Sequence, residues 1–385
     1  MRLLVLDQYS QLGGAQQVLL ELLPAIRRRG WDVLIGLPGE GEFFSRARAL
    51  DTKVEQIACG PFTSGRKSLA DVKRLVTQTP RLAWQLRRLA AKIRADIVYI
   101  NGPRLLPAAA CAGFTCPVLF HSHSYLAPGP NRLLAGLSLR RLRARVIGCC
   151  RFVANVWQDF APGRISVIYN GVAAEKGFYR SPDPHRYTIG CIGRISPEKG
   201  QREFIDAASA IHRLLPSCRF VIYGSALFAD PAARQYDEEI RTASAGLPVE
   251  FAGWIEDVRS ALSALDLLLV PSASHEATPR VILEAFAAGV PVIAFASGGI
   301  PELIDNGRTG LLARDAPEMA RLALELLTRH RPQLADIAHE ARLSWLKSFT
   351  LERFQSQCLA MIQSLAPRES SIYSFPALLR TPPLH

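Results

Sequence analysis

The sequence predicts an α/β protein built from two domains, each around a parallel sheet. Short runs rich in Val, Ile and Leu alternate with amphipathic helical stretches along most of the chain, as in sheets covered by helices on both faces. A length of 385 residues exceeds what one hydrophobic core usually organises, which favours two domains. A polar segment with two prolines at 181–185 separates the two series of runs and is the best linker in the chain.

The expected elements follow this division. Residues 1–180 form the first domain and 186–345 the second, and a helix within 346–366 is expected to cross back. Residues 367–385 lack periodicity and are expected to be a flexible tail. The predicted strands of the first domain are 3–7, 33–37, 53–58, 97–101, 118–121, 146–149 and 165–169. Those of the second domain are 188–192, 219–223, 249–251, 267–270, 292–295 and 310–312.

Charge is distributed unevenly along the chain. Residues 1–180 contain 26 lysines and arginines against 11 acidic residues, whereas the remainder contains 20 against 23. The basic half indicates attraction to an anionic surface or acceptor, or arginines that coat solvent-exposed helices. The basic residues lack interleaved aromatic side chains and carry no recognised binding motif, which excludes nucleic acid as the expected partner.

The apolar runs and the cysteines indicate a cytoplasmic protein. No run reaches the roughly 18 apolar residues that a membrane span needs, and the run at 3–6 is too short for a signal peptide. The eight cysteines show no metal-ligand spacing, so we expect reduced thiols packed as small apolar groups.

A strand leads through glycines into a helix once in each half. Gly13 and Gly14 precede a helix expected to start near residue 15, and Lys199 with Gly200 introduces another. Glycine lets backbone amides approach a ligand, and a helix N-terminus favours an anion. Arg194 and Lys199 add two cations to the second turn, which suits a diphosphate. Neither turn matches a dinucleotide or P-loop motif.

Two carboxylates flank the start of another predicted helix. Thr278 is the predicted N-cap, with Pro279 as the first helical residue, so Glu276 lies in the preceding loop and Glu284 inside the helix. The residues that flank Glu284 are apolar, and we therefore expect its hydrogen-bond donors to come from outside the helix, with sugar or ribose hydroxyls as candidates. An ordinary exposed helix stripe is the alternative.

Five segments of the sequence resemble a known family. GRISPEKG at 193–200, HEATPRVILEAFAAGVPVIAF at 275–295 and SGGIPELIDNGRTGLL at 297–312 resemble the donor half of retaining glycosyltransferases of family 4, the glycosyl transferases group 1. GGAQQVLLELLPAIRRRGWDV at 13–33 and VIYNGV at 167–172 are similar to the first half of that family. The resemblance implies the GT-B fold, in which two Rossmann-like domains face a central cleft.

The resemblance also implies roles for particular residues. Arg194 and Lys199 would hold the donor diphosphate, Glu276 would orient the donor sugar, and Glu284 would bind the ribose. The backbone at Gly13 and Gly14 would close over the phosphates, assisted by amides around Gly298, Gly299 and Ile300.

His123 matches a histidine at a strand end that faces the donor sugar, although His121 would share its face of the strand. The chain departs from the family pattern at Ala277, where glycine is usual, and at Cys150, where serine is usual. Neither departure removes a charged group.

The implied activity is that of a hexosyl-type glycosyltransferase that moves a sugar from a nucleoside diphosphate sugar to an acceptor hydroxyl with retention. The chain has no DxD-like acidic cluster, and we expect no metal and no further cofactor. The expected acceptor is a glycan or lipid-linked molecule of cell-envelope polysaccharide or glycolipid synthesis. A nucleotide-sugar 2-epimerase and a catalytically silent nucleotide-sugar-binding protein are the alternatives.

A basic amphipathic segment in the first half predicts peripheral contact with an anionic membrane. Its members are Arg140, Arg141, Arg143 and Arg145 beside Leu133, Leu134, Leu137 and Leu139. A solvated helix end is the alternative interpretation.

Overall fold

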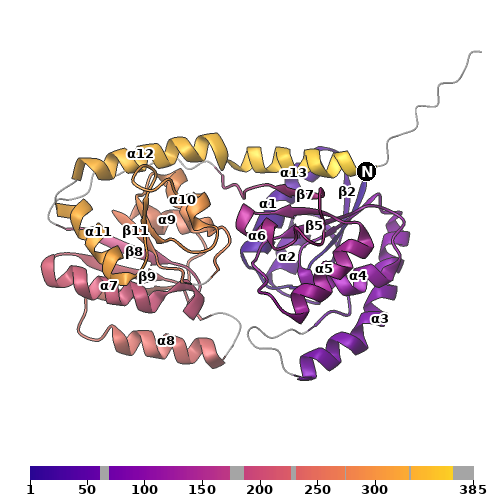
Figure 1. Cartoon of the computed structure of the whole chain (residues 1–385), viewed down its shortest axis with the longest axis horizontal. Coiled ribbons are helices and arrows are strands. Elements are labelled where there is room, and N and C mark those ends of the chain that lie inside the picture. The colour runs from indigo at the N-terminus through magenta and orange to yellow at the C-terminus, as the bar shows by residue number, and fades with distance from the viewer. Residues whose placement is uncertain (61–68, 174–185, 227–230, 274, 329–330, 367–385) are drawn as a thin grey trace, which may run out of the picture.

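The computed structural model shows two domains side by side (Figure 1). It describes residues 1–60, 69–173, 186–226, 231–273, 275–328 and 331–366. The predicted linker at 181–185 and the tail at 367–385 lie outside these ranges. Each domain is built around a parallel sheet, and the predicted two-domain Rossmann-like α/β class is therefore confirmed.

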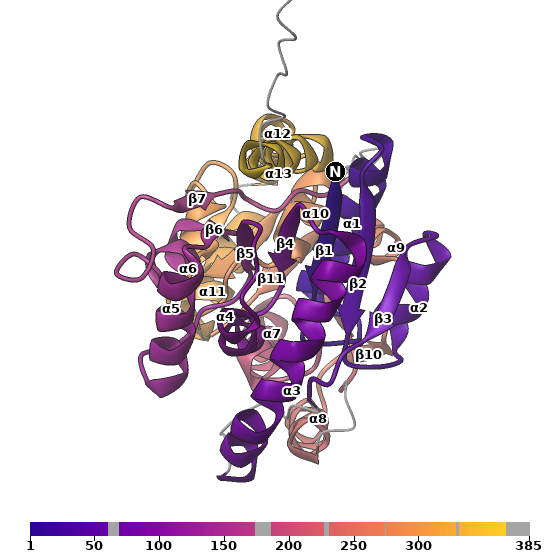
Figure 2. The same ribbon diagram turned by 90° about the vertical axis from the view of Figure 1, so that its right-hand side faces the viewer.

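The first domain contains a seven-stranded sheet in the order β3-β2-β1-β4-β5-β6-β7, and Figure 2 looks onto these strands. The strands are β1 (Arg2–Leu6), β2 (Asp32–Leu37), β3 (Lys53–Gln56), β4 (Ile97–Ile100), β5 (Val118–Ser122), β6 (Arg145–Gly148) and β7 (Ile165–Val167). The helices are α1 (Gly14–Arg28), α2 (Glu42–Ala49), α3 (Leu69–Ile93), α4 (Leu106–Ala112), α5 (Pro130–Leu142) and α6 (Arg151–Asn155), with a 3-10 turn η1 (Pro103–Leu105).

The second domain contains a six-stranded sheet in the order β10-β9-β8-β11-β12-β13. The strands are β8 (Thr188–Ile192), β9 (Arg219–Tyr223), β10 (Val249–Gly253), β11 (Leu267–Val270), β12 (Val292–Phe295) and β13 (Leu311–Ala313). The helical elements are η2 (Pro197–Lys199), α7 (Gln201–Leu214), α8 (Pro231–Ala243), α9 (Val258–Ser263), α10 (Arg280–Ala288), η3 (Ile300–Glu302), α11 (Ala316–Thr328), α12 (Arg331–Ser348) and α13 (Leu351–Leu365).

All thirteen predicted strands are present, with ends that differ by at most a few residues. The apolar runs predicted the inner strands well because these are covered on both faces: two buried clusters flank the first sheet and two flank the second. The eight cysteines are free thiols, six of them buried, as the sequence predicts.

The chain passes between the domains twice, and the two passages lie together. Val172 donates its amide to the carbonyl of Phe349 at 3.0 Å, and Leu351 donates to Val172 at 2.9 Å. Gly171 permits this approach, because a Cβ there would stand 2.3 Å from the carbonyl oxygen of Thr350. Asn170-Gly171 is therefore part of an interdomain crossing, beyond the simple turn that its sequence indicates.

Helix α13 returns to the first domain, as Figure 1 shows along one edge of the molecule. Thr350 caps it by accepting a hydrogen bond from the amide of Arg353. Its apolar side chains join the buried cluster of the first sheet that includes Leu3 and Val5. The C-terminal helix thus belongs to the core of the N-terminal domain. Within the described ranges, no helix is both long and apolar enough to span a bilayer.

Removing the Phe354 ring should test how strongly α13 holds the domains together. Phe354 is 1% exposed within that cluster, so Phe354→Ala should lower the free energy of unfolding by about 3–5 kcal/mol in urea denaturation. Leu346→Ala on α12 is the control, because Leu346 is 53% exposed and its loss should cost within about 0.5 kcal/mol. Equal effects of the two changes would show that the packing of α13 adds little stability.

Candidate functional site

Lys199 and Glu276 meet in an ion pair between two connections of the second sheet. The Lys199 ammonium at the end of η2 lies 2.5 Å from Oε2 of Glu276, which follows β11. Both side chains are largely enclosed, at 28% and 17% exposed, so each charge depends on the other and on whatever ligand enters. The structure therefore joins the predicted diphosphate cation to the predicted sugar carboxylate.

Glycines fix the backbone beneath Glu276. The amide of Gly299 donates to the carbonyl of Glu276 at 2.8 Å. Gly298 adopts a φ of +55°, and a Cβ at that position would stand 2.0 Å from the same carbonyl oxygen. The amide of Ile300 donates to Ser297 at 3.1 Å. The amides of Gly299 and Ile300, expected to face the phosphates, are thus engaged within the protein and hold the Glu276 loop.

Arg194 lies on the same connection as Lys199. Its Nη2 lies 3.0 Å from Oε2 of Glu198, four residues later, and its side chain is 35% exposed. Gly200 brings this connection against β11, because its φ of +73° and a Cβ only 1.9 Å from the Pro271 carbonyl exclude other residues. The predicted cations thus both lie on the β8–α7 connection, each beside a carboxylate.

Helix α10 differs from its prediction in two respects. The N-cap is Pro279, and the helix starts at Arg280, one residue later than expected. The hydroxyl of Thr278, the predicted cap, instead accepts a hydrogen bond from Asn170 of the first domain at 2.9 Å. Glu284 also has a donor within its own helix: Arg280 Nη2 lies 3.4 Å from its Oε1. The expectation that the hydrogen-bond donors of Glu284 come from outside the helix is therefore wrong for Arg280, because residues four apart share a helix face.

Arg280 also joins the two domains. Its guanidinium donates to both carboxylate oxygens of Glu21 on α1, at 2.8 and 2.7 Å. Burial lowers the pKa of Arg280, but Glu21 and Glu284 outweigh this effect and raise it above its ordinary value. The sequence analysis did not identify Arg280 or Glu21 as site residues. The four-residue spacing between Arg280 and Glu284 could have predicted their contact within α10, but nothing comparable predicts the contact with Glu21.

A buried carboxylate organises the glycine turn of the first domain. Asp7, at the end of β1, accepts from Gln16 Nε2 at 2.9 Å and from Asn101 Nδ2 at 2.6 Å. Burial outweighs these bonds and raises the pKa of Asp7 to about 6. Gln16 lies in the first turn of α1, next to Gly13 and Gly14. A Cβ at Gly14 would meet nothing within 4 Å, whereas one at Gly13 would stand 2.9 Å from Oε1 of Gln16, so the predicted phosphate turn is open at Gly14.

The same network sets the protonation of His123. Asn101 turns its amide nitrogen to Asp7, so its oxygen lies 2.7 Å from Nε2 of His123 and accepts a hydrogen bond from the proton on that nitrogen. Nδ1 of His123 then carries a lone pair, and within the described residues it is buried without a hydrogen-bond partner. Burial lowers the pKa of His123 to about 3, so the ring is neutral.

His121 is the deeper of the two histidines. It is fully buried, its Nδ1 lies 2.5 Å from the Tyr99 hydroxyl, and its ring stacks near Phe354 of α13. The two imidazoles lie 3.8 Å apart. His123, which retains some exposure just beyond β5, is therefore the histidine placed to meet a ligand.

The two departures from the family pattern touch one another across the domains. The Sγ of Cys150 lies 3.7 Å from the Ala277 carbonyl oxygen. A Cβ at Gly299 would stand 2.7 Å from the same sulfur, so Cys150 fills the space beside the glycine turn. The substitutions thus pack together at the interface and leave the Lys199–Glu276 pair in place.

Other contacts join the segments that follow the strands of each sheet. Glu302 accepts from the amides of Arg151 and Phe152 and from the Tyr169 hydroxyl, at 2.7–2.8 Å. The ring of His275, beside Glu276, stacks on Tyr125 of the first domain at 4.5 Å. The carboxyl ends of both sheets therefore face the domain interface, where ligands of open α/β sheets bind.

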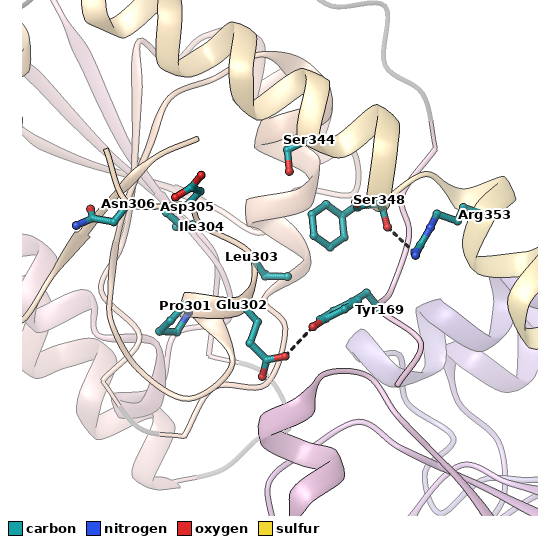
Figure 3. A pocket seen from close by; sticks show the side chains of 11 residues that line it. Tyr169, Pro301, Glu302, Leu303, Ile304, Asp305, Asn306, Ser344, Ser348 and Arg353 are labelled. Atoms are coloured by element: carbon teal, nitrogen blue, oxygen red, sulfur yellow. Dashed lines mark hydrogen bonds between the residues drawn. The ribbon is translucent and has the colours of Figure 1, made fainter. Parts of the chain in front are cut away.

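A cavity of about 450 Å³ lies beside this interface, between η3 and the junction of α12 and α13 (Figure 3). Figure 3 shows Glu302 bonded to Tyr169, and Arg353 bonded to the carbonyl of Ser348. None of the predicted site residues lines it. Its charged groups are bound to the protein, so it adds no chemistry to the predicted donor site.

In the part of the chain that the structure describes, no three His, Cys, Asp or Glu side chains are grouped to hold a metal ion.

The basic amphipathic segment lies on α5 and the residues that follow it. On α5, Leu133, Leu134 and Leu137 are exposed, at 41–54%, whereas Leu139 is fully buried. Leu139 was therefore wrongly assigned to the contact surface, because it packs into the core of the first domain.

Comparison with known proteins identifies the family. A profile described as glycosyl transferases group 1 matches residues 186–329, and one described as glycosyltransferase family 4 matches residues 12–176. The 2-deoxystreptamine N-acetyl-D-glucosaminyltransferase of Streptomyces fradiae is 31% identical over 85% of this chain and 86% of its own. The chain belongs to glycosyltransferase family 4.

Other members of the family match over shorter stretches. The lipopolysaccharide core mannosyltransferase LpsB of Rhizobium meliloti is 31% identical over 48% of this chain and 53% of its own. The α-maltose-1-phosphate synthase of Mycolicibacterium smegmatis is 31% identical over 42% of this chain and 44% of its own. The chain thus spans about half the length of several curated relatives that it matches.

Solved structures agree with the fold. Anabaena HepE, crystallised with UDP and glucose, is 25% identical and superposes with a TM-score of 0.76 over 95% of this chain and all of that one. Sucrose-phosphate synthase of Thermosynechococcus elongatus gives 0.76 at 18% identity, over 95% and 99% of the two chains. The predicted GT-B architecture of this family 4 glycosyltransferase is confirmed.

The protonation of His123 can be measured directly. Nitrogen-15 NMR of histidine-labelled protein should show a proton on Nε2 and none on Nδ1 from pH 8 to pH 5, because the pKa lies at about 3. The exposed His339 serves as an internal reference, and Asn101→Leu should abolish the preference by removing the acceptor. Protonation of the ring above pH 5 would contradict this assignment.

Proposed function

We propose that this family 4 glycosyltransferase transfers a hexosyl group from a nucleoside diphosphate sugar to an acceptor hydroxyl, with retention of anomeric configuration. The observation that carries the proposal is the pairing of Lys199 with Glu276, next to Arg194, at the carboxyl end of the second sheet. Two cations suit the diphosphate, and a carboxylate beside them suits the sugar hydroxyls. The structure of HepE with UDP-glucose supports this class of donor.

The leaving diphosphate determines what the cations do. As the bond between the anomeric carbon and the phosphate oxygen breaks, negative charge grows on that oxygen, and the ammonium of Lys199 moves from Glu276 to stabilise it. The guanidinium of Arg194 binds the second phosphate. In this mechanism the two side chains neutralise the leaving group without a metal ion.

Retention follows if the acceptor attacks from the face that the diphosphate leaves. The acceptor oxygen then forms the new bond to the anomeric carbon, and its proton passes to the departing phosphate oxygen. Glu276, freed from Lys199, orients the sugar hydroxyls. His123 presents the lone pair of Nδ1, so it accepts a hydrogen bond from the sugar.

The acceptor side is proposed from the first domain. LpsB is a mannosyltransferase of lipopolysaccharide core biosynthesis, which supports a glycan or lipid-linked acceptor of the cell envelope. Arg140 and Arg143 are exposed beside the exposed leucines of α5, so this helix offers positive charge and apolar surface together. We assign it to peripheral contact with an anionic membrane on the cytoplasmic side.

Removing the Lys199 charge tests the donor site. A thermal-shift panel of UDP-, GDP- and ADP-sugars first selects the donor that stabilises the protein. With that donor, Lys199→Ala should lower kcat roughly 10²–10³-fold, whereas Lys347→Ala, an exposed lysine on α12, should leave it unchanged.

Near-normal turnover by Lys199→Ala would refute the assignment. Product analysis with and without acceptor separates transfer from 2-epimerisation, and absence of both products from wild-type protein would indicate a silent binding protein.

Liposome flotation tests the membrane surface. The protein should float with vesicles that contain anionic lipid and release at high salt, and Arg140→Gln with Arg143→Gln should weaken binding by about 1 kcal/mol per arginine. The paired changes Arg259→Gln and Arg308→Gln remove two exposed arginines of the second domain and are the matched control. Equal flotation with neutral vesicles would exclude this surface.

A further inference from the structure

Arg280 divides one guanidinium between two carboxylates that belong to different domains. Its Nη2 lies 2.7 Å from Oε1 of Glu21 and 3.4 Å from Oε1 of Glu284, while Nη1 is 2.8 Å from Oε2 of Glu21. The three side chains are 15–22% exposed. The stronger, bidentate contact is therefore made across the domains, and the weaker one to the predicted ribose carboxylate.

Glu21 is held firmly in place. Gln17 donates to its carboxylate at 3.1 Å, and Gln355 of α13 donates to its backbone carbonyl at 2.6 Å. Arg28 in turn donates to Gln355 at 3.1 Å. Residues of α1 and α13 thus hold Glu21 in place independently of Arg280, which favours a fixed geometry for the ion pair.

We propose that Arg280 is a positioning residue. The carboxylate of Glu21 binds its guanidinium and so keeps the guanidinium from binding Glu284 fully. The Glu284 carboxylate can therefore accept the ribose hydroxyls only while α1 is docked on α10. This inference rests on the proposed donor site. It gives the interdomain contact a role in substrate binding, since the helix that begins at Gly13–Gly14 controls the carboxylate that selects the ribose.

The geometry predicts a different defect at Glu284 when each partner of the pair is removed. Without the Glu21 charge, Arg280 turns fully to Glu284, which lies on the same helix face four residues later, and competes with the ribose. Without Arg280, two largely enclosed carboxylates lose the cation that they share, and their repulsion displaces one of them. Removing both charges relieves each problem, because Glu284 then faces neither a competing arginine nor an uncompensated neighbour.

The test compares nucleotides that differ only at the ribose. Calorimetry measures the affinities of UDP, GDP and ADP and of their 2′-deoxy forms for wild-type protein, and the tightest ribonucleotide and its deoxy form are kept. Wild type should prefer the ribonucleotide about tenfold, the order expected for a hydrogen bond to a carboxylate. Glu21→Gln and Arg280→Met should each reduce the preference to about twofold or less.

The double variant Glu21→Gln/Arg280→Met is decisive. It should regain a preference several-fold above either single variant, whereas a merely structural contact would leave the double variant, which also lacks that contact, no better than the single variants. Arg308→Met, which removes an exposed arginine paired with Glu340, is the matched control and should keep the wild-type preference. Thermal unfolding checks that each variant is folded.

The remaining outcomes separate this inference from the proposed function. Additive loss in the double variant overturns the inference and leaves the donor site standing. Wild-type protein that binds nucleotides without ribose preference refutes the Glu284 contact, and the inference with it. Wild-type protein that binds none of the nucleotides refutes the proposed function itself.

Discussion

The bidentate ion pair between Glu21 and Arg280 is the contact on which the arrangement of the site depends. Each charge is largely enclosed, so neither is tolerated alone, and the pair is satisfied only when α1 and α10 lie together. The glycine turn at the start of α1 and the Glu276–Glu284 segment therefore cannot move independently without exposing a buried charge. The passages at Val172 and Phe349 join the same domains covalently, but they do not specify the faces that meet. The ion pair adds this specificity.

Close contacts between backbone segments at two glycines position the side chains of Lys199 and Glu276. Gly200 sets the Lys199 turn against β11, and Gly298 sets the glycine turn against the Glu276 carbonyl. At both positions a Cβ would stand about 2 Å from a carbonyl oxygen, a distance that no small shift accommodates. Because the two turns approach the same strand end from different sides, the ammonium of Lys199 meets the carboxylate of Glu276. The backbone thus sets the geometry of the pair.

How far the sequence predicts this structure depends on whether a feature is local. The strands were predictable because burial on both faces leaves continuous apolar runs, and Lys199 and Glu276 were predictable because each stands beside a glycine turn or a helix start. Thr278 was misassigned because a hydroxyl before a helix usually caps it, and only the packing of the first domain brings Asn170 to it. Asp7 and Asn101 follow neighbouring parallel strands, a signal that strand order alone reveals. The partnership of Glu21 and Arg280, 259 residues apart, leaves no local pattern at all.

The distribution of charge assigns different chemistry to the two domains. The second domain presents Arg194 and Lys199, cations suited to a leaving diphosphate, on the connection after β8. The first domain presents His123, which burial keeps neutral, and it buries the side chain of Asp7 behind Asn101. A third positive charge at His123 would already attract the diphosphate of the bound donor, and attraction that is equal in the bound donor and the transition state does not accelerate transfer. A neutral acceptor instead orients the sugar while the charge that grows during reaction meets only the donor-domain cations.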